Sequence, residues 1–197
     1  MKTDIILAGV GGQGILSIAT VLGIAALDEN LYLKQAEVHG MSQRGGDVQS
    51  NLRISDSPIA SDLIKLGGAD LIVSLEPMEG LRYLPFLKKN GWLITNSVPF
   101  INIVNYPSEE ILSSELKKVE NSVVFDMDQL AKEAGSPKAS NMILLGAASP
   151  FIELSADSMR DGIKELFLKK GEKIAELNIK AFELGRKKSE EILKEKK

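Results

Sequence analysis

The chain opens with a hydrophobic pattern that predicts a strand followed by a helix. Residues 5–8 form an apolar run with the length of a buried strand, and residues 15–27 are nearly all apolar or small, as expected of a helix packed on a sheet. The loop between them reads Gly-Val-Gly-Gly-Gln-Gly. Its glycines at positions 9, 11 and 14 fit the pattern G-x-G-x-x-G, in the strand–loop–helix context that this pattern requires. These elements indicate the first β–α unit of a Rossmann-like sheet.

The pattern then alternates between short strands and helices before it becomes helical. Apolar and alternating runs predict strands at residues 31–36, 48–55, 70–75, 91–95 and 123–125. We expect helices at residues 60–66 and after Glu76-Pro77, the second with Leu81, Leu84 and Leu87 on one side. A short extra strand is expected near residues 101–104. Helices are predicted at residues 128–134, 141–148, 158–168 and 172–197.

This order of elements predicts an α/β protein. We expect a Rossmann-like three-layer fold with a mostly parallel sheet and a helical C-terminal segment, in which residues 1–197 form a single domain. The apolar stripe of the last helix either docks on this chain's own sheet or meets a partner subunit.

Composition and charge exclude several classes of protein. The net charge of -3 argues against a nucleic-acid binder, which normally has a basic excess. The chain has no cysteine, so disulfides, cysteine zinc sites and thiolate-held iron–sulfur clusters are excluded. We expect no signal peptide, because the chain begins close to the first predicted strand, and no segment has the apolar length to span a bilayer. We expect a soluble, cytoplasmic protein without nucleic-acid or membrane partners.

The glycine loop predicts a seat for an anion. The first glycine permits a tight turn, the second lets backbone approach a ligand, and the third lets the helix pack closely. Unpaired N–H groups at the start of a helix attract a phosphate or a carboxylate. Glu37, at the end of the second predicted strand, would hold ribose hydroxyls in a dinucleotide-binding fold. The alternative is a tight β–α turn without a ligand.

A second loop, residues 38–47, carries the other candidate chemistry. It contains three glycines and the only histidine, His39, whose side chain could act as an acid or base near neutral pH. Arg44 is the best anion-binding side chain, because a guanidinium group binds phosphate or carboxylate at two points. Alternatively, Arg44 ties the loop to a helix C-terminus or a buried carboxylate. No serine-hydrolase elbow, zinc-protease motif, P-loop or thiamine diphosphate motif occurs, and no metal site is expected.

Together the two loops resemble a known family. Gly-Val-Gly-Gly-Gln-Gly at residues 9–14 and Glu-Val-His-Gly-Met-Ser-Gln-Arg-Gly-Gly-Asp-Val at residues 37–48 resemble the gamma-type subunit of 2-oxoacid:ferredoxin oxidoreductases. The form His-Gly-Met-Ser-Gln-Arg-Gly-Gly is closest to the beta subunit of indolepyruvate:ferredoxin oxidoreductase. Two later motifs, Asn-Met-Ile-Leu-Leu-Gly at residues 141–146 and Asn-x-x-Ala-Phe-x-x-Gly at residues 178–185, resemble the C-terminal half of that family.

The resemblance implies a division of labour. A partner subunit would carry thiamine diphosphate, Mg and iron–sulfur clusters, ferredoxin would accept the electrons, and coenzyme A would take the acyl group of a small 2-oxoacid, such as indolepyruvate or another arylpyruvate. This chain would hold none of those cofactors, would be inactive alone, and would complete the assembly and shape the route of coenzyme A or substrate. Its candidate catalytic residues are His39 and Arg44, and its candidate cofactor-binding residues are Gly9, Gly11, Gly12, Gln13, Gly14, Ser42 and Gln43.

Two other functions remain open from the sequence. A stand-alone NAD(P)-dependent oxidoreductase would use the same glycines and Glu37, although the chain has no hydride-transfer constellation such as Tyr-x-x-x-Lys. A non-catalytic ligand-binding or assembly module would bind a small anion but support no turnover with any partner.

Overall fold

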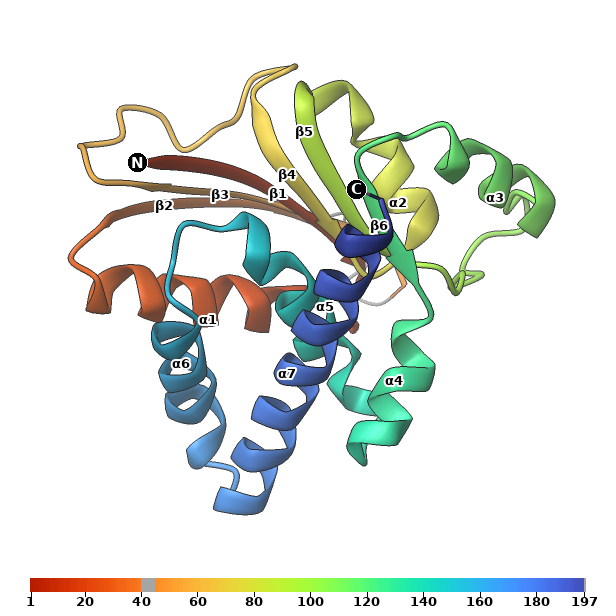
Figure 1. Cartoon of the computed structure of the whole chain (residues 1–197). Coiled ribbons are helices and arrows are strands. Elements are labelled where there is room, and N and C mark those ends of the chain that lie inside the picture. The colour runs from red at the N-terminus through yellow and green to blue at the C-terminus, as the bar shows by residue number, and fades with distance from the viewer. Residues whose placement is uncertain (40–44, 197) are drawn as a thin grey trace.

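One mixed sheet forms the middle layer of the fold (Figure 1). The computed structural model describes residues 1–38 and 45–196 in full, together with the backbone of His39. The strands are β1 (Lys2–Val10), β2 (Tyr32–His39), β3 (Asp47–Ser55), β4 (Ala69–Ser74), β5 (Leu87–Asn96) and β6 (Ser122–Phe125). The helices are α1 (Ile15–Asp28), α2 (Pro77–Arg82), α3 (Glu109–Lys117), α4 (Met127–Ala134), α5 (Ser140–Ala148), α6 (Ala156–Leu168) and α7 (Glu172–Glu195), with 3₁₀ turns at Leu84–Phe86, Pro137–Ala139 and Ser149–Phe151.

The strand order is β2-β3-β1-β4-β5-β6. The strands β1, β4, β5 and β6 pair in parallel, whereas β3 is antiparallel to both β1 and β2. Because β2 is antiparallel to β3, it points the same way as β1, and only β3 runs against the others. The prediction of a mostly parallel sheet is confirmed. The insertion of β3 between β1 and β2 differs from a dinucleotide-binding fold, in which the second strand lies directly beside the first.

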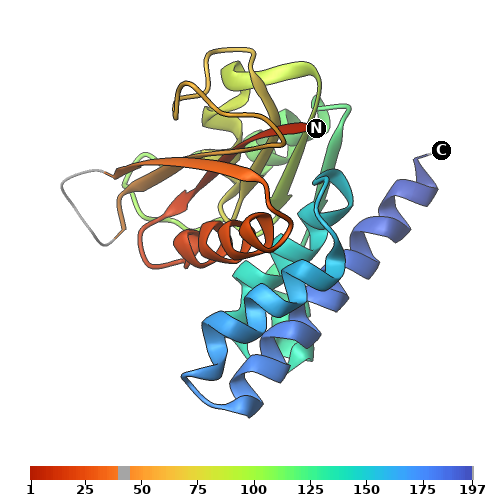
Figure 2. The same ribbon diagram turned by 90° about the vertical axis from the view of Figure 1, so that its left-hand side faces the viewer.

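Successive residues of β1 enter two separate cores. Ile5 and Leu7 pack into the larger core with α1 and the C-terminal helices, whereas Ile6 and Ala8 pack into the smaller core on the opposite face. This division follows from the alternation of side chains along a strand. Figures 1 and 2 show α1 and α5–α7 on the same side of the sheet, with α2 on the other. The predicted three-layer α/β fold and helical C-terminal segment are confirmed.

The apolar stripe of α7 packs within this chain. Ala175, Ala181 and Phe182 are buried in the larger core, where α7 lies against α5 and α6. Of the two sequence-based interpretations of this stripe, the structure supports docking on the chain's own core. Among the helices that the structure describes, none is both long and apolar enough to cross a bilayer.

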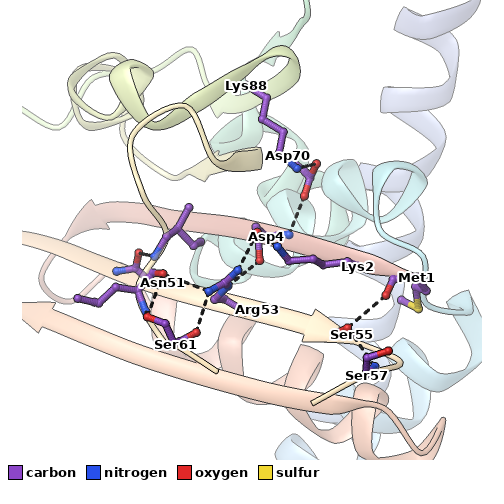
Figure 3. Close-up of polar contacts among 12 residues, drawn as sticks. Met1, Lys2, Asp4, Asn51, Arg53, Ser55, Ser57, Ser61, Asp70 and Lys88 are labelled. Atoms are coloured by element: carbon purple, nitrogen blue, oxygen red, sulfur yellow. Dashed lines mark hydrogen bonds and ion pairs between the residues drawn. The ribbon is translucent and has the colours of Figure 1, made fainter. Parts of the chain in front are cut away.

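The helix predicted at residues 60–66 is wrong, because side chains on β3 bind the backbone groups that a helix would use. Arg53 donates to the carbonyl oxygen of Ser61 at 2.8 Å, and Asn51 accepts from the N–H of Ile64 at 3.1 Å. Figure 3 shows both β3 side chains turned toward this segment. Residues 56–68 therefore form an irregular cover over the smaller core.

Two neighbouring predictions also differ from the structure. The helix expected to include Leu81, Leu84 and Leu87 ends at Arg82, and Leu87 begins β5. Pro85 explains why the helix does not continue, since proline has no N–H to donate to the carbonyl oxygen four residues earlier. Residues 101–104, expected to form a short strand, have no regular secondary structure. Neither difference changes the order of the strands in the sheet.

Candidate functional site

The glycine loop leaves several N–H groups at the start of α1 without a partner. Gly12 and Gly14 have positive φ angles of 102° and 82°, and Gly14 is the N-cap of α1 without a side-chain cap. The N–H groups of Gly11 and Gln13 are already bonded, to the carbonyl oxygens of Gly46 and Val10. Within the described part of the chain, no hydrogen bond satisfies the N–H groups of four residues, Gly12, Gly14, Ile15 and Leu16. These four groups can bind an anion.

Gln13 closes the turn from within. Its Oε1 atom accepts from the N–H of Val10 at 2.8 Å, and its Nε2 atom lies 3.5 Å from the carbonyl oxygen of Leu75. A Cβ atom on Gly9 would lie 2.9 Å from the same Oε1 atom. The structure thus confirms that Gly9 permits the tight turn, and it gives Gln13 a role in holding the turn together, which the sequence pattern did not indicate.

Gly14 also brings α1 against the start of α5. The side-chain nitrogen of Asn141 donates to the carbonyl oxygen of Gly14 at 3.2 Å, and a Cβ atom on Gly14 would lie 2.7 Å from that nitrogen. Asn141 is 7% exposed, and its Oδ1 atom has no hydrogen-bond partner among the described residues. The first residue of the 141–146 motif therefore holds the end of the glycine loop in place.

A pocket of about 410 Å³ lies beside the glycine loop. Among the described residues its only charged side chain is that of Glu37, which the sequence placed near a ligand hydroxyl. The pocket thus combines a cluster of N–H groups with a carboxylate, and suits a ligand that has both an anionic group and a hydrogen-bond donor. Its lining is Val10, Gly11, Gly12, Gly14, Ile15, Leu16, Glu37 and Val48.

The sheet register brings the two predicted loops to the same edge. Val48 on β3 lies opposite Gly9 on β1 and opposite His39 on β2. Two strand spacings separate the backbones of Gly9 and His39 by ~10 Å. The strand predicted at residues 31–36 extends to His39, so His39, expected in the second loop, is the last residue of β2; its side chain lies outside the described atoms. Ser42, Gln43 and Arg44 lie outside the described residues, so their predicted contacts stay predictions.

The far end of the second loop is bonded directly to the glycine loop. The N–H of Gly11 donates to the carbonyl oxygen of Gly46 at 2.8 Å. In return, the N–H of Gly45 donates to the carbonyl oxygen of Gly11 at 3.3 Å. The side-chain nitrogen of Asn102 donates to the carbonyl oxygen of Gly45 at 2.8 Å. Three segments of the chain therefore meet at Gly45 and Gly46.

A cluster of ionisable side chains, which sequence reasoning missed, lies at the start of β3. Tyr83 donates to Asp47 at 2.8 Å, and Arg82 binds the carboxylate of Glu79 at 2.7 and 3.3 Å. Burial raises the pKa of Glu79, as does the neighbouring carboxylate of Asp47, while Arg82 opposes the shift. Burial and the bond to Asp47 also raise the pKa of Tyr83. The cluster anchors the first residue of β3, directly after Gly46.

The irregular segment after β5 is anchored by a buried glutamate. Glu76 is fully buried and caps α2 through the N–H of Glu79. Its other oxygen accepts from the N–H of Phe100 at 3.3 Å and from the hydroxyl of Tyr106. The only sequence signal for this role was the Glu-Pro pair at the start of a helix.

The described residues contain no group of three or more histidine, aspartate or glutamate side chains placed to hold a metal ion.

Residues 4–188 match the protein family described as pyruvate ferredoxin/flavodoxin oxidoreductase. The chain is 38% identical to indolepyruvate oxidoreductase subunit IorB of Pyrococcus horikoshii, over 96% of this chain and 97% of that protein. It is 37% identical to the protein of the same name in Thermococcus kodakarensis, over 96% of this chain and 97% of that protein. The 2-oxoglutarate synthase subunit KorC of Methanocaldococcus jannaschii is 29% identical, over 98% and 96%.

Solved structures share this fold. The gamma subunit of a keto/oxoacid ferredoxin oxidoreductase from Geobacter sulfurreducens superposes with a TM-score of 0.71 at 23% identity, over 96% of this chain and 99% of that one. A 2-oxoglutarate:ferredoxin oxidoreductase from Magnetococcus marinus, with 2-oxoglutarate, coenzyme A and succinyl-CoA bound, superposes with a TM-score of 0.75 at 21% identity. There the match covers 96% of this chain but 31% of the other, so the same fold is one part of a longer polypeptide.

Proposed function

Because the chain belongs to the pyruvate ferredoxin/flavodoxin oxidoreductase family, we propose that it is the small subunit of an indolepyruvate:ferredoxin oxidoreductase. The observation that carries this substrate class is the identity along almost the whole chain. Relatives named for indolepyruvate are 31–38% identical, whereas those named for 2-oxoglutarate are 29% identical. Residues 1–197 act as one unit of a cytoplasmic complex.

In the proposed reaction the 2-oxoacid loses its carboxyl group as CO₂, coenzyme A takes the acyl group as a thioester, and two electrons pass to ferredoxin. Thiamine diphosphate with Mg²⁺ and iron–sulfur clusters, held by the larger subunit, supply the decarboxylation and the electron transfer. This division fits the chain's own residues. The sequence contains no cysteine to bind a cluster, and a pocket lies beside the unpaired N–H groups of the glycine loop.

The glycine pocket would hold the anionic end of a small molecule at the interface with the larger subunit. The N–H groups of Gly12 and Gly14 and of the first residues of α1 would bind a phosphate group, such as one of coenzyme A. Glu37 would accept from a hydroxyl or amine of the same molecule. Arg44 would add the positive charge that the described lining lacks, and His39 would hold or release a proton beside it.

One observation supports the alternative function, a stand-alone NAD(P)-dependent enzyme: Glu37 lines the same pocket. The strand order argues against that function. In the nicotinamide-binding fold the acidic residue follows a strand that is a direct, parallel neighbour of β1, and here β3 occupies that place. A nicotinamide cofactor bound by the isolated chain would support the alternative.

The proposal is tested on the native complex. Affinity purification from anaerobic extract should recover a larger subunit with thiamine diphosphate and iron–sulfur absorbance. The complex should reduce ferredoxin with indolepyruvate and coenzyme A faster than with pyruvate or 2-oxoglutarate. A chain that is recovered alone and binds NAD(P) would contradict the proposal, and a chain that binds a small anion without turnover would indicate a non-catalytic module.

Arg44→Ala tests the role of the second loop within the complex. The variant complex should assemble normally, bind coenzyme A more weakly in calorimetry and turn over more slowly, because an anion-binding charge is lost. Lys65→Ala is the matched control, since Lys65 is an exposed cation at the opposite edge of the sheet. Unchanged turnover and unchanged coenzyme A binding in Arg44→Ala would rule out the proposed contact.

A further inference from the structure

The segment Phe100-Ile-Asn-Ile-Val104 exposes four large apolar side chains within five residues. Ile101 is 72% exposed and Val104 is fully exposed, and Phe100 and Ile103 are each about half exposed. Single exposed apolar residues are ordinary on a protein surface, but a contiguous patch marks an interaction site. Residues 97–108 also contain no charged residue, in a chain that is 26% charged. Charged residues are depleted at the centres of protein–protein interfaces.

The segment is held at two points, and the chain just after it at a third. Asn102, between the exposed residues, donates to the carbonyl oxygen of Gly45 at 2.8 Å. The N–H of Phe100 and the hydroxyl of Tyr106 both donate to the buried carboxylate of Glu76. The apolar side chains are therefore presented by anchored backbone, and a partner that covers them has little chain entropy to overcome.

The segment lies beside the glycine pocket. Asn102 bonds to Gly45, and the Gly45–Gly46 pair bonds to Gly11, which lines the glycine pocket. A subunit that brings cofactors to the glycine pocket must approach this edge of the sheet and so meets the segment beside it. In the Magnetococcus marinus structure the matching region is 31% of the chain, so there the same fold is one part of a longer polypeptide.

We propose that residues 100–104 form the apolar centre of the contact with the larger, cofactor-bearing subunit. This inference rests on the proposed function. A stable interface buries roughly 800 Å² on each partner, more than four side chains supply, so these residues are the centre of a wider contact that continues toward the glycine pocket. Because residues 97–108 are uncharged, the affinity should change little with salt.

The test is the binding of the larger subunit to tagged variants of this chain, each produced together with the larger subunit as the complex. The double variant Ile101→Asp/Val104→Asp should bind roughly 30-fold more weakly or worse, because two charges enter an apolar contact centre. Both side chains are exposed, so the melting temperature and circular dichroism of the free variant should match the wild type. Raising the salt concentration should leave the wild-type affinity nearly unchanged.

The matched control is Leu63→Asp/Leu66→Asp. These leucines are 59% and 66% exposed and lie in another irregular segment, residues 56–68, which covers the smaller core. This variant should bind the larger subunit as the wild type does. If Ile101→Asp/Val104→Asp also binds like the wild type, the surface assignment is overturned while the proposed function stands. If the wild-type chain itself captures no cofactor-bearing subunit, the proposed function fails and this inference falls with it.

Discussion

Gly146 and Gly185 bring the backbones of α5 and α7 into direct contact. A Cβ atom on Gly146 would lie 1.9 Å from the carbonyl oxygen of Phe182, and one on Gly185 would lie 2.0 Å from that of Ile143. Neither glycine has a positive φ angle, so space rather than backbone conformation requires glycine there. The two residues end the two C-terminal motifs that resembled the family, and the close crossing gives those motifs a physical reason.

Gly185→Ala should destabilise the protein strongly. The added methyl group meets backbone atoms of α5, which cannot move without shifting a helix that is buried from Asn141 to Ala148. Overpacking of this kind costs about 1–3 kcal/mol, with backbone collisions at the upper end. Urea unfolding of the free chain measures the loss.

Gly23→Ala is the control for that substitution. Gly23 is also buried in a helix, but its added Cβ would meet Leu33 at 3.4 Å, an ordinary contact. Alanine favours a helix over glycine by about 0.5–1 kcal/mol, so this variant should be neutral or slightly more stable. Equal losses of stability in both variants would contradict the close-crossing account.

Gln13→Ala should lower the stability of the folded chain, even when no ligand is present. It removes the acceptor of the buried Val10 N–H, and an unsatisfied buried donor costs roughly 1–3 kcal/mol. Gln13→Glu keeps an acceptor oxygen at this position and should retain most of the stability. Chemical unfolding compares the three proteins, and an unchanged Gln13→Ala would show that the turn does not depend on this side chain.

Asp4 should make stability fall in acid. Burial alone would raise the pKa of Asp4, but hydrogen bonds from Arg53 and Lys2 outweigh it and lower the pKa below the ordinary 3.8. The ionised form is therefore favoured by folding, and its contribution is present above the ordinary pKa and lost as the pH falls through the native value. Figure 3 shows Asp4 between Lys2 and Arg53.

Asp4→Asn isolates this contribution. Near neutral pH the variant should be less stable by roughly 2 kcal/mol, because hydrogen bonds to a charged group are lost. The difference from wild type should narrow as the pH falls below ~4. Denaturant titrations over a pH series measure the difference in the free energy of unfolding between the two proteins. A difference that does not depend on pH would show that the charge of Asp4 does not cause the loss of stability.

Glu79 should have the opposite effect. Burial and the nearby charge of Asp47 raise its pKa above the ordinary 4.5, against the influence of Arg82. Its contribution to stability is fully present below the ordinary pKa and is lost as the pH rises through the native value. Wild type should therefore lose stability relative to Glu79→Gln as the pH rises from ~4.5. The same pH series measures the difference in the free energy of unfolding between the two proteins. If wild type instead became more stable relative to Glu79→Gln as the pH rises, the pKa of Glu79 would be lowered rather than raised.

Much of the fold could be predicted from local patterns. The strand–glycine loop–helix unit and the C-terminal helices depend on the periodicity of neighbouring residues, which the chain itself displays. The predicted helix at residues 60–66 failed because its backbone is bonded to Arg53 and Asn51, which belong to a different strand. Local propensity carries no information about such partners.

The sequence by itself determined the α/β class, the candidate loops and the chemistry that a chain without cysteine cannot perform. Only the tertiary structure decided that β3 separates β1 from β2, that Gln13 holds its own turn, and that Asn102 joins Gly45 beside an exposed apolar segment. The physical reason is distance along the chain. Asn141 and Gly14 are 127 residues apart in sequence yet hydrogen-bonded, and such contacts form only when the whole sheet and its helices have packed.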